Sequence, residues 1–130
     1  MGFDASSYNF STDFPGGIAS NVYNISITKT GRLRVVITWD AFASGCSSAN
    51  GSGCTSDTPD GDIDLYVYQK SGSSWLLRCT SNTYDGTWEL CDAPVTAGQT
   101  YKTELHLRSS FSTGTYLGIA WWNYNPSTDE

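Results

Sequence analysis

The sequence predicts an all-β fold, an antiparallel β-sandwich of jelly-roll type with seven to eight strands. Several short segments alternate apolar and polar residues with a period of two, which is the pattern of a strand that buries one face. Clusters of Gly, Pro, Ser and Asn separate these segments and predict turns. No segment keeps the 3.6-residue period of an amphipathic helix over a helical length. Many short strands with turns between them indicate a sandwich of two sheets.

The strongest strand pattern lies in residues 32–40, where Leu33, Val35, Ile37 and Trp39 point to one side. Further strands are expected at 21–28, 62–69, 75–80, 87–91, 101–108 and 115–122, after a candidate edge strand that includes Tyr8 and Phe10. At 130 residues the chain is long enough for one core. We expect one sandwich domain at 21–124, an N-terminal edge or linker segment at 1–20 and a tail at 125–130.

An acidic turn runs directly into a strand at residues 58–68. Ile63, Leu65 and Val67 form its apolar face, and the opposite face carries Asp62, Asp64, Tyr66 and Tyr68. Asp60, Asp62 and Asp64 repel one another unless a cation or several N–H donors lie between them. Oxygen ligands of this kind suit a hard cation such as calcium. The alternative is a solvated turn and strand start that keeps a sheet edge soluble.

A calcium ion is therefore expected at the start of this strand. The strands that end at Asp40 and begin near Asp62 flank one long loop, so antiparallel pairing would place these two side chains together. The candidate ligands, not all of which need bind the ion, are Asp40, Asp57, Asp60, Asp62 and Asp64.

Four cysteines fit two disulfides, and three pairings are possible. Their spacing favours Cys46–Cys54 inside one loop and Cys79–Cys91 across a hairpin. A zinc site is disfavoured, because the sequence has no Cys-x-x-Cys and its only histidine is His106. Disulfides indicate an oxidising compartment, so we expect a secreted, extracellular protein.

Charge and the histidine count exclude several classes of function. A net charge of −6 argues against nucleic acid and anionic membranes as partners, and a monomer is expected. A serine or cysteine hydrolase needs a base beside its nucleophile. His106 falls on a strand face with Lys102, Glu104 and Arg108, which is expected to be an exposed polar side. The chain is not expected to be an enzyme.

Aromatic residues that strand alternation turns away from the core are candidates for a binding platform. These are Tyr66, Tyr68 and Trp122, with Tyr124 just past the last expected strand. Trp75 and Trp88 flank the expected hairpin, so that one is core and the other exposed. The alternative is that these rings cover apolar surface beneath the long loop.

The order of motifs resembles the pre-peptidase C-terminal family, β-sandwich domains that follow the catalytic domain in secreted bacterial subtilisin-like proteases and other peptidases. The resemblance covers about residues 21–122. A strand ending in Trp39-Asp40 is followed by a loop, by Asp60-Gly61-Asp62-Ile63-Asp64-Leu65-Tyr66-Val67-Tyr68, by Trp88-Glu89, by Ala97-Gly98-Gln99-Thr100-Tyr101 and by Tyr116-Leu117-Gly118-Ile119-Ala120-Trp121. The long cysteine-bearing loop and the abundance of Trp and Tyr depart from the family pattern.

The resemblance implies a non-catalytic accessory module of a secreted bacterial hydrolase. Some members of the family bind calcium, and some bind insoluble substrates such as collagen or chitin; Asp60, Asp62 and Asp64 match the acidic strand start that often lies near a metal. The expected partners are the catalytic domain of a parent chain and a polymer, either a polysaccharide or an insoluble protein. The abundant aromatic residues favour carbohydrate. The alternative is a purely structural domain that stabilises an extracellular protease or assists its secretion.

Overall fold

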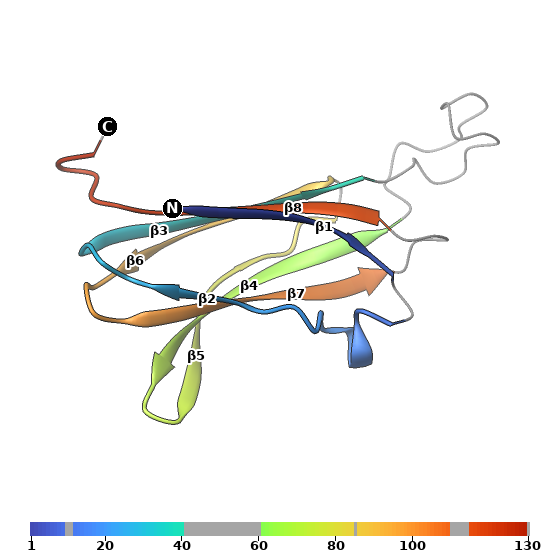
Figure 1. The fold of residues 1–130 in the computed structure, drawn as a ribbon, viewed down its shortest axis with the longest axis horizontal. Helices are drawn as coiled ribbons and strands as arrows, with labels where there is room; N and C mark the ends of the chain where they lie inside the picture. Colours follow the sequence, from blue (N-terminus) through green and yellow to red (C-terminus); the bar gives the residue numbers. More distant parts are fainter. Residues whose placement is uncertain (10–11, 41–60, 85, 110–114, 130) are drawn as a thin grey trace.

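The structure, a computed structural model, describes residues 1–9, 12–40, 61–84, 86–109 and 115–129. Its strands form two antiparallel four-stranded sheets that lie face to face, which confirms the predicted all-β sandwich (Figure 1). The strands are β1 (Gly2–Tyr8), β2 (Tyr23–Ser26), β3 (Gly31–Trp39), β4 (Asp62–Ser71), β5 (Ser74–Ser81), β6 (Trp88–Val95), β7 (Thr100–Ser109) and β8 (Thr115–Tyr124). A short 3₁₀ helix, η1 (Pro15–Gly17), precedes β2.

The strand order is that of a jelly roll. The first sheet has the order β1-β8-β3-β6, and the second has the order β2-β7-β4-β5. The chain changes sheet at every connection except the one between β4 and β5, which form a hairpin that projects from the body of the sandwich (Figure 1). Most strand neighbours are therefore distant in sequence, as in double Greek-key sandwiches.

The core lies between the sheets and follows the predicted alternation. Leu33, Val35, Ile37 and Trp39 of β3 are all buried, because alternate side chains of a strand point to the same face. Opposite them lie buried residues of the second sheet, including Ile63, Leu65, Val67, Tyr101 and Leu105. Burying an aliphatic side chain of this size contributes about 1.5–3 kcal/mol relative to leaving it exposed.

The N-terminal segment contributes an edge strand to the first sheet. β1 pairs with β8 along its full length, from Gly2 opposite Trp121 to Tyr8 opposite Thr115. It is also tied to the second sheet, because the Tyr23 hydroxyl donates a hydrogen bond to Asp4 at 2.7 Å.

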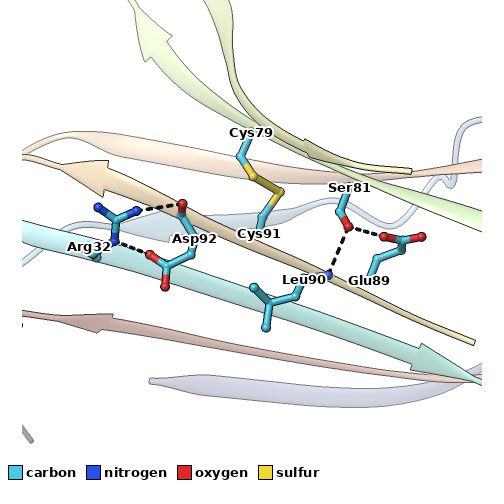
Figure 2. Close-up of a disulfide and its surroundings, with 7 residues drawn as sticks. All are labelled: Arg32, Cys79, Ser81, Glu89, Leu90, Cys91 and Asp92. Atoms are coloured by element: carbon cyan, nitrogen blue, oxygen red, sulfur yellow. Dashed lines mark hydrogen bonds and ion pairs between the residues drawn. A yellow bond between two sulfur atoms is a disulfide. The ribbon is translucent and has the colours of Figure 1, made fainter. Parts of the chain in front are cut away.

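The predicted Cys79–Cys91 disulfide is confirmed, but the hairpin expected around it is wrong. β5 pairs with β4 and β6 pairs with β3, so the two cysteines lie on the edge strands of opposite sheets. The disulfide therefore bridges the two layers of the sandwich (Figure 2). Cys46 and Cys54 lie outside the described residues.

Candidate functional site

Three buried carboxylates meet where the two sheets come together. Asp62 and Asp64 stand at the start of β4 in the second sheet, and Glu89 stands near the start of β6 in the first. One carboxylate oxygen of each lies within 4.8 Å of the others. Their residues are only 6%, 2% and 1% exposed respectively, so water screens their charges poorly. We call these three residues the acidic cluster.

The cluster combines an inward position of one strand with the buried start of another. Glu89 occupies an inward position of β6, in one series with Cys91, Ala93 and Val95. The first residues of β4, from Asp62 to Leu65, are buried on both faces of the strand. The register between β4 and β7 shifts between Asp62 and Ile63, where Arg108 is the extra residue of β7.

The cluster has fewer partners than its charge requires. Glu89 accepts hydrogen bonds from the Ser81 hydroxyl and, at 2.7 Å, from the Thr83 hydroxyl (Figure 2 shows the bond to Ser81). The Arg108 guanidinium lies 3.3 Å from one Asp64 oxygen. The other oxygen of Asp64 and one oxygen of Asp62 are buried without a hydrogen-bond partner in the described part of the chain. Such orphaned oxygens point to a further group bound between them.

The electrostatics agree with this interpretation. Burial raises the pKa of Asp62 from 3.8 to about 6, and the nearby charges of Asp64 and Glu89 add to the rise. Burial also raises the pKa of Asp64, while the charge of Arg108 opposes the shift. The protein therefore holds these carboxylates where their ionised form is disfavoured, which a bound cation would reverse.

A hollow of about 230 Å³ opens beside the two aspartates. The residues that line it all carry polar groups, and they are Asp62, Asp64, Asn82, Tyr84, Arg108 and Ser109. Carboxylate, amide, hydroxyl and backbone oxygens are the donors that calcium takes. The buried, unpartnered oxygens of Asp62 and Asp64 therefore fit a hard divalent cation.

The aspartates predicted to bind calcium do not all meet at one site in the structure. Asp62 and Asp64 belong to the acidic cluster. Asp40 does not: it is exposed, and β3 belongs to the opposite sheet from β4, so the expected pairing of these two strands is wrong. Asp57 and Asp60 lie outside the described residues. Glu89 was missed, although its place in an otherwise apolar inward series of β6 was a signal that it is buried.

The predicted aromatic platform is divided between the two sheets. Tyr66, Tyr68 and Trp75 lie on the outer side of the second sheet, and each is half-buried. Tyr66 stacks on His106 with ring centroids 4.0 Å apart, and it also stacks on Tyr68 at 6.3 Å. Lys102 lies over both Tyr68 and Trp75. The faces of these rings are thus largely occupied by protein groups.

The polar side expected around His106 is covered rather than exposed. Glu104 binds Lys102 at 2.8 Å and His106 at 3.1 Å, and all three side chains are mostly buried. Only Arg108 of this series is well exposed, with 65% of its side chain accessible. The partly buried row exists because β4 places Tyr66 opposite Glu104 and Tyr68 opposite Lys102.

The outer side of the first sheet carries most of the exposed aromatic residues of the described ranges; Tyr84, in the segment between β5 and β6, is a further one. Trp88 and Trp122 are 60% and 39% exposed, and Tyr124 packs against Trp122 at the end of β8. Two aromatic residues that were not predicted extend this surface: Phe3 is 83% exposed and Tyr116 is 68% exposed. We call this side the exposed face. Trp75 and Trp88 do not flank one hairpin, and neither belongs to the core.

Comparisons with known proteins find weak structural similarity and low sequence identity. The sequence matches no protein-family model. It also matches no curated protein. A solved structure from Sulfurospirillum deleyianum is similar with a TM-score of 0.46 and 7% identity, over 93% of this chain and 99% of that chain. PliG from Aeromonas hydrophila, a periplasmic inhibitor of g-type lysozyme, gives a TM-score of 0.44 and 8% identity, over 93% of this chain and 85% of its own. The Yersinia pseudotuberculosis-derived mitogen is similar with a TM-score of 0.37 and 13% identity, over 86% of this chain and 92% of its own.

Likenesses at this level carry no functional argument. The Cys79–Cys91 disulfide itself fits a protein of an oxidising, non-cytoplasmic compartment. Within the described ranges, no helix is long and apolar enough to cross a membrane.

The raised pKa of Asp62 predicts an unusual pH dependence in calcium-free protein. The folded state holds the Asp62 proton more tightly than the unfolded state, so this contribution to stability is full below about pH 3.8 and is lost as the pH rises through about 6. In chelator, the free energy of unfolding of the wild type should fall relative to Asp62→Asn by up to about 1.4 kcal/mol per pH unit in this window. Urea unfolding at a series of pH values measures the difference.

The matched control is Asp129→Asn, which alters a partly exposed carboxylate that pairs with Lys29 far from the cluster in sequence. This control should retain the wild-type slope attributed to Asp62. Parallel pH profiles for the wild type and Asp62→Asn would contradict the assignment of a raised pKa to Asp62.

Proposed function

We propose that this chain is a non-catalytic binding module that holds a secreted bacterial hydrolase on a polymeric substrate, and that it binds the polymer through the exposed face of the first sheet. The polymer is a polysaccharide or an insoluble protein. Calcium at the acidic cluster stabilises the module. The motif order of the sequence supports the link to a secreted hydrolase, and the disulfide fits an extracellular setting.

The observation that carries the proposal is the concentration of exposed apolar rings on one sheet. Phe3, Trp88, Tyr116 and Trp122 project from three of its four strands, and Leu90 on β6 is also exposed. Contiguous exposed apolar surface is uncommon on soluble proteins and marks interaction sites. Burying one ring face contributes on the order of 1–2 kcal/mol, so a few rings together suffice for micromolar to millimolar affinity once ordering costs are subtracted.

The second sheet is a weaker candidate for the same role. Its rings are stacked against His106, against one another and beneath Lys102, so their faces are not free to receive a ligand. The same contacts involve the only histidine, whose Nε2 lies 3.1 Å from Glu104. His106 thus packs and pairs within the protein, which supports a non-catalytic role for the module.

Calcium at the acidic cluster would serve stability and not chemistry. Asp62, Asp64 and Glu89 would supply its carboxylate ligands, and the ion would neutralise charges that the described residues balance mainly with Arg108. Because Glu89 belongs to one sheet and the aspartates to the other, an ion here would join the two layers.

Retention on insoluble polymer tests the binding face. Trp88→Ala and Trp122→Ala should each weaken retention of the isolated chain about 5- to 30-fold, since each removes one ring contact of about 1–2 kcal/mol. Tyr66→Ala and Tyr68→Ala on the second sheet are the matched controls and should leave retention unchanged. Depletion assays on chitin, cellulose and fibrous collagen measure the effect, and thermal unfolding confirms that each variant is folded.

Two outcomes would contradict the proposal. If no polymer retains the wild type, the alternative of a purely structural domain gains support. If the control variants lose retention and the Trp variants do not, the ligand binds the second sheet instead.

Calcium addition tests the acidic cluster. Calcium at about 100 times its dissociation constant should raise the free energy of unfolding of chelator-treated protein by about 2.7 kcal/mol, because the ion binds the folded state alone. Ser81 and Thr83 donate to different oxygens of Glu89, so Glu89→Gln keeps an acceptor for one of these two hydrogen bonds, yet it should lose most of this gain. Asp129→Asn should keep the gain. A melting temperature that does not respond to calcium or chelator would rule out the site.

A further inference from the structure

We propose that Arg108 is a built-in counterion of the acidic cluster, and that a calcium ion displaces it from Asp64 on binding. Arg108 thereby lowers the affinity of the site for calcium and sets the calcium concentration at which the site fills. This inference rests on the calcium site of the proposed function. It assigns a role there to a residue that is not one of the ligands.

Arg108 reaches the cluster from the solvent. It is the extra residue of β7 at the register shift against β4. An irregularity of this kind changes the direction in which a side chain points. The Arg108 side chain is 65% exposed, yet its Nε lies 3.3 Å from an oxygen of Asp64, whose side chain is 2% exposed. Arg108 can therefore leave the buried carboxylate without crossing the core.

Arg108 balances the charge of the cluster incompletely. Burial raises the pKa of both Asp62 and Asp64, and the charge of Arg108 opposes the rise at each. The guanidinium brings one positive charge to three carboxylates, and its ion pair is with Oδ2 of Asp64. The Oδ1 atoms of both aspartates stay buried without a hydrogen-bond partner in the described ranges. A divalent ion carries twice the charge and binds such oxygens directly, so it satisfies the cluster better than Arg108 does.

Arg108 and a calcium ion cannot share Asp64 without repulsion. The two positive charges would be separated by a single carboxylate group, well within the Debye length of about 10 Å in moderate salt. Because a guanidinium has only donors, Arg108 cannot offset this repulsion by acting as a ligand of the ion. Binding of the ion therefore breaks the ion pair between Arg108 and Asp64, and the free energy of that pair is subtracted from the free energy of calcium binding.

The hollow beside the aspartates has room for this exchange. It measures about 230 Å³, and Arg108 is part of its lining. One water molecule occupies about 30 Å³ in the liquid, so an ion and several waters fit in the hollow. The guanidinium can turn toward the solvent that already reaches most of the side chain.

Calorimetric titration with calcium chloride tests the inference on chelator-treated protein, at a pH well above the Asp62 pKa of about 6. Arg108→Gln should bind calcium at least about fivefold more tightly than the wild type, because the ion no longer displaces a paired cation. Arg108→Lys keeps the charge and should stay nearer to the wild type. The matched control is Arg78→Gln, which removes the same charge from β5, where Arg78 donates to Gln69. Its affinity should change less than about twofold.

Stability measurements complete the same thermodynamic cycle. In chelator, Arg108→Gln should be less stable than the wild type, because the buried Asp64 loses its ion pair. In saturating calcium this difference should disappear, since the wild type has then given up the same pair. By linkage, the change between the two conditions must match the ratio of calcium affinities. A merely structural contact would instead cost the same stability in both conditions.

Nuclear magnetic resonance of the arginine Nε–H groups follows the displacement in the wild type itself. The Arg108 signal is identified by its absence from the spectrum of Arg108→Lys. Calcium should shift it toward the position of a free, exposed arginine. The signals of Arg32, Arg34 and Arg78, which pair with Asp92 or Gln69, should not move.

The other outcomes separate the inference from the calcium site on which it rests. If Arg108→Gln binds calcium no more tightly than the wild type, or if the Arg108 signal does not move at saturating calcium, the inference is overturned and the calcium site stands. Weaker binding by Arg108→Gln would show that Arg108 stays in the loaded site. If neither the wild type nor any variant binds calcium, both the inference and the proposed calcium site are contradicted.

Discussion

The burial of three carboxylates from opposite sheets is the constraint on which this sandwich depends. One carboxylate oxygen of each of Asp62, Asp64 and Glu89 lies within 4.8 Å of the others, and in the described ranges Arg108 forms an ion pair with Asp64. Like charges in a poorly solvated place repel one another unless they are protonated or share a cation. The stability of this end of the molecule should therefore depend on pH, and the proposed cation would relieve the repulsion, whereas the apolar core carries no such charges.

The cluster and the disulfide act on the same edge of the molecule. β5 and β6 are edge strands of different sheets, and Cys79–Cys91 joins them. The hydrogen bond between Ser81, two residues after Cys79, and Glu89, two residues before Cys91, joins them as well (Figure 2). These links hold the layers together at an edge where no backbone ladder connects them. They all lie between the sheets, so the outer side of the first sheet remains free to bind a ligand.

The local alternation of apolar and polar residues was sufficient to predict where strands form and which of their side chains face the core. The alternation in β3 and β4 predicted the burial of Leu33 and Leu65, because side-chain period is a local property. It did not tell which sheet each strand joins, since six of seven connections cross between layers. For this reason the sequence did not predict that Glu89 lies close to Asp62. It also assigned Tyr66 and Trp122 to one aromatic platform, although they lie on the outer faces of different sheets.

The central claim is that the exposed face of the first sheet is the binding surface, and hydroxyl-radical footprinting on the solid ligand tests it directly. The reagent oxidises accessible aromatic side chains, and mass spectrometry locates the oxidised residues. Adsorption should protect Phe3, Trp88, Tyr116 and Trp122 and leave the modification of Tyr66, Tyr68 and Tyr84 unchanged. Protection concentrated on the second sheet, or equal modification of Trp88 and Tyr116 in free and adsorbed protein, would contradict the account.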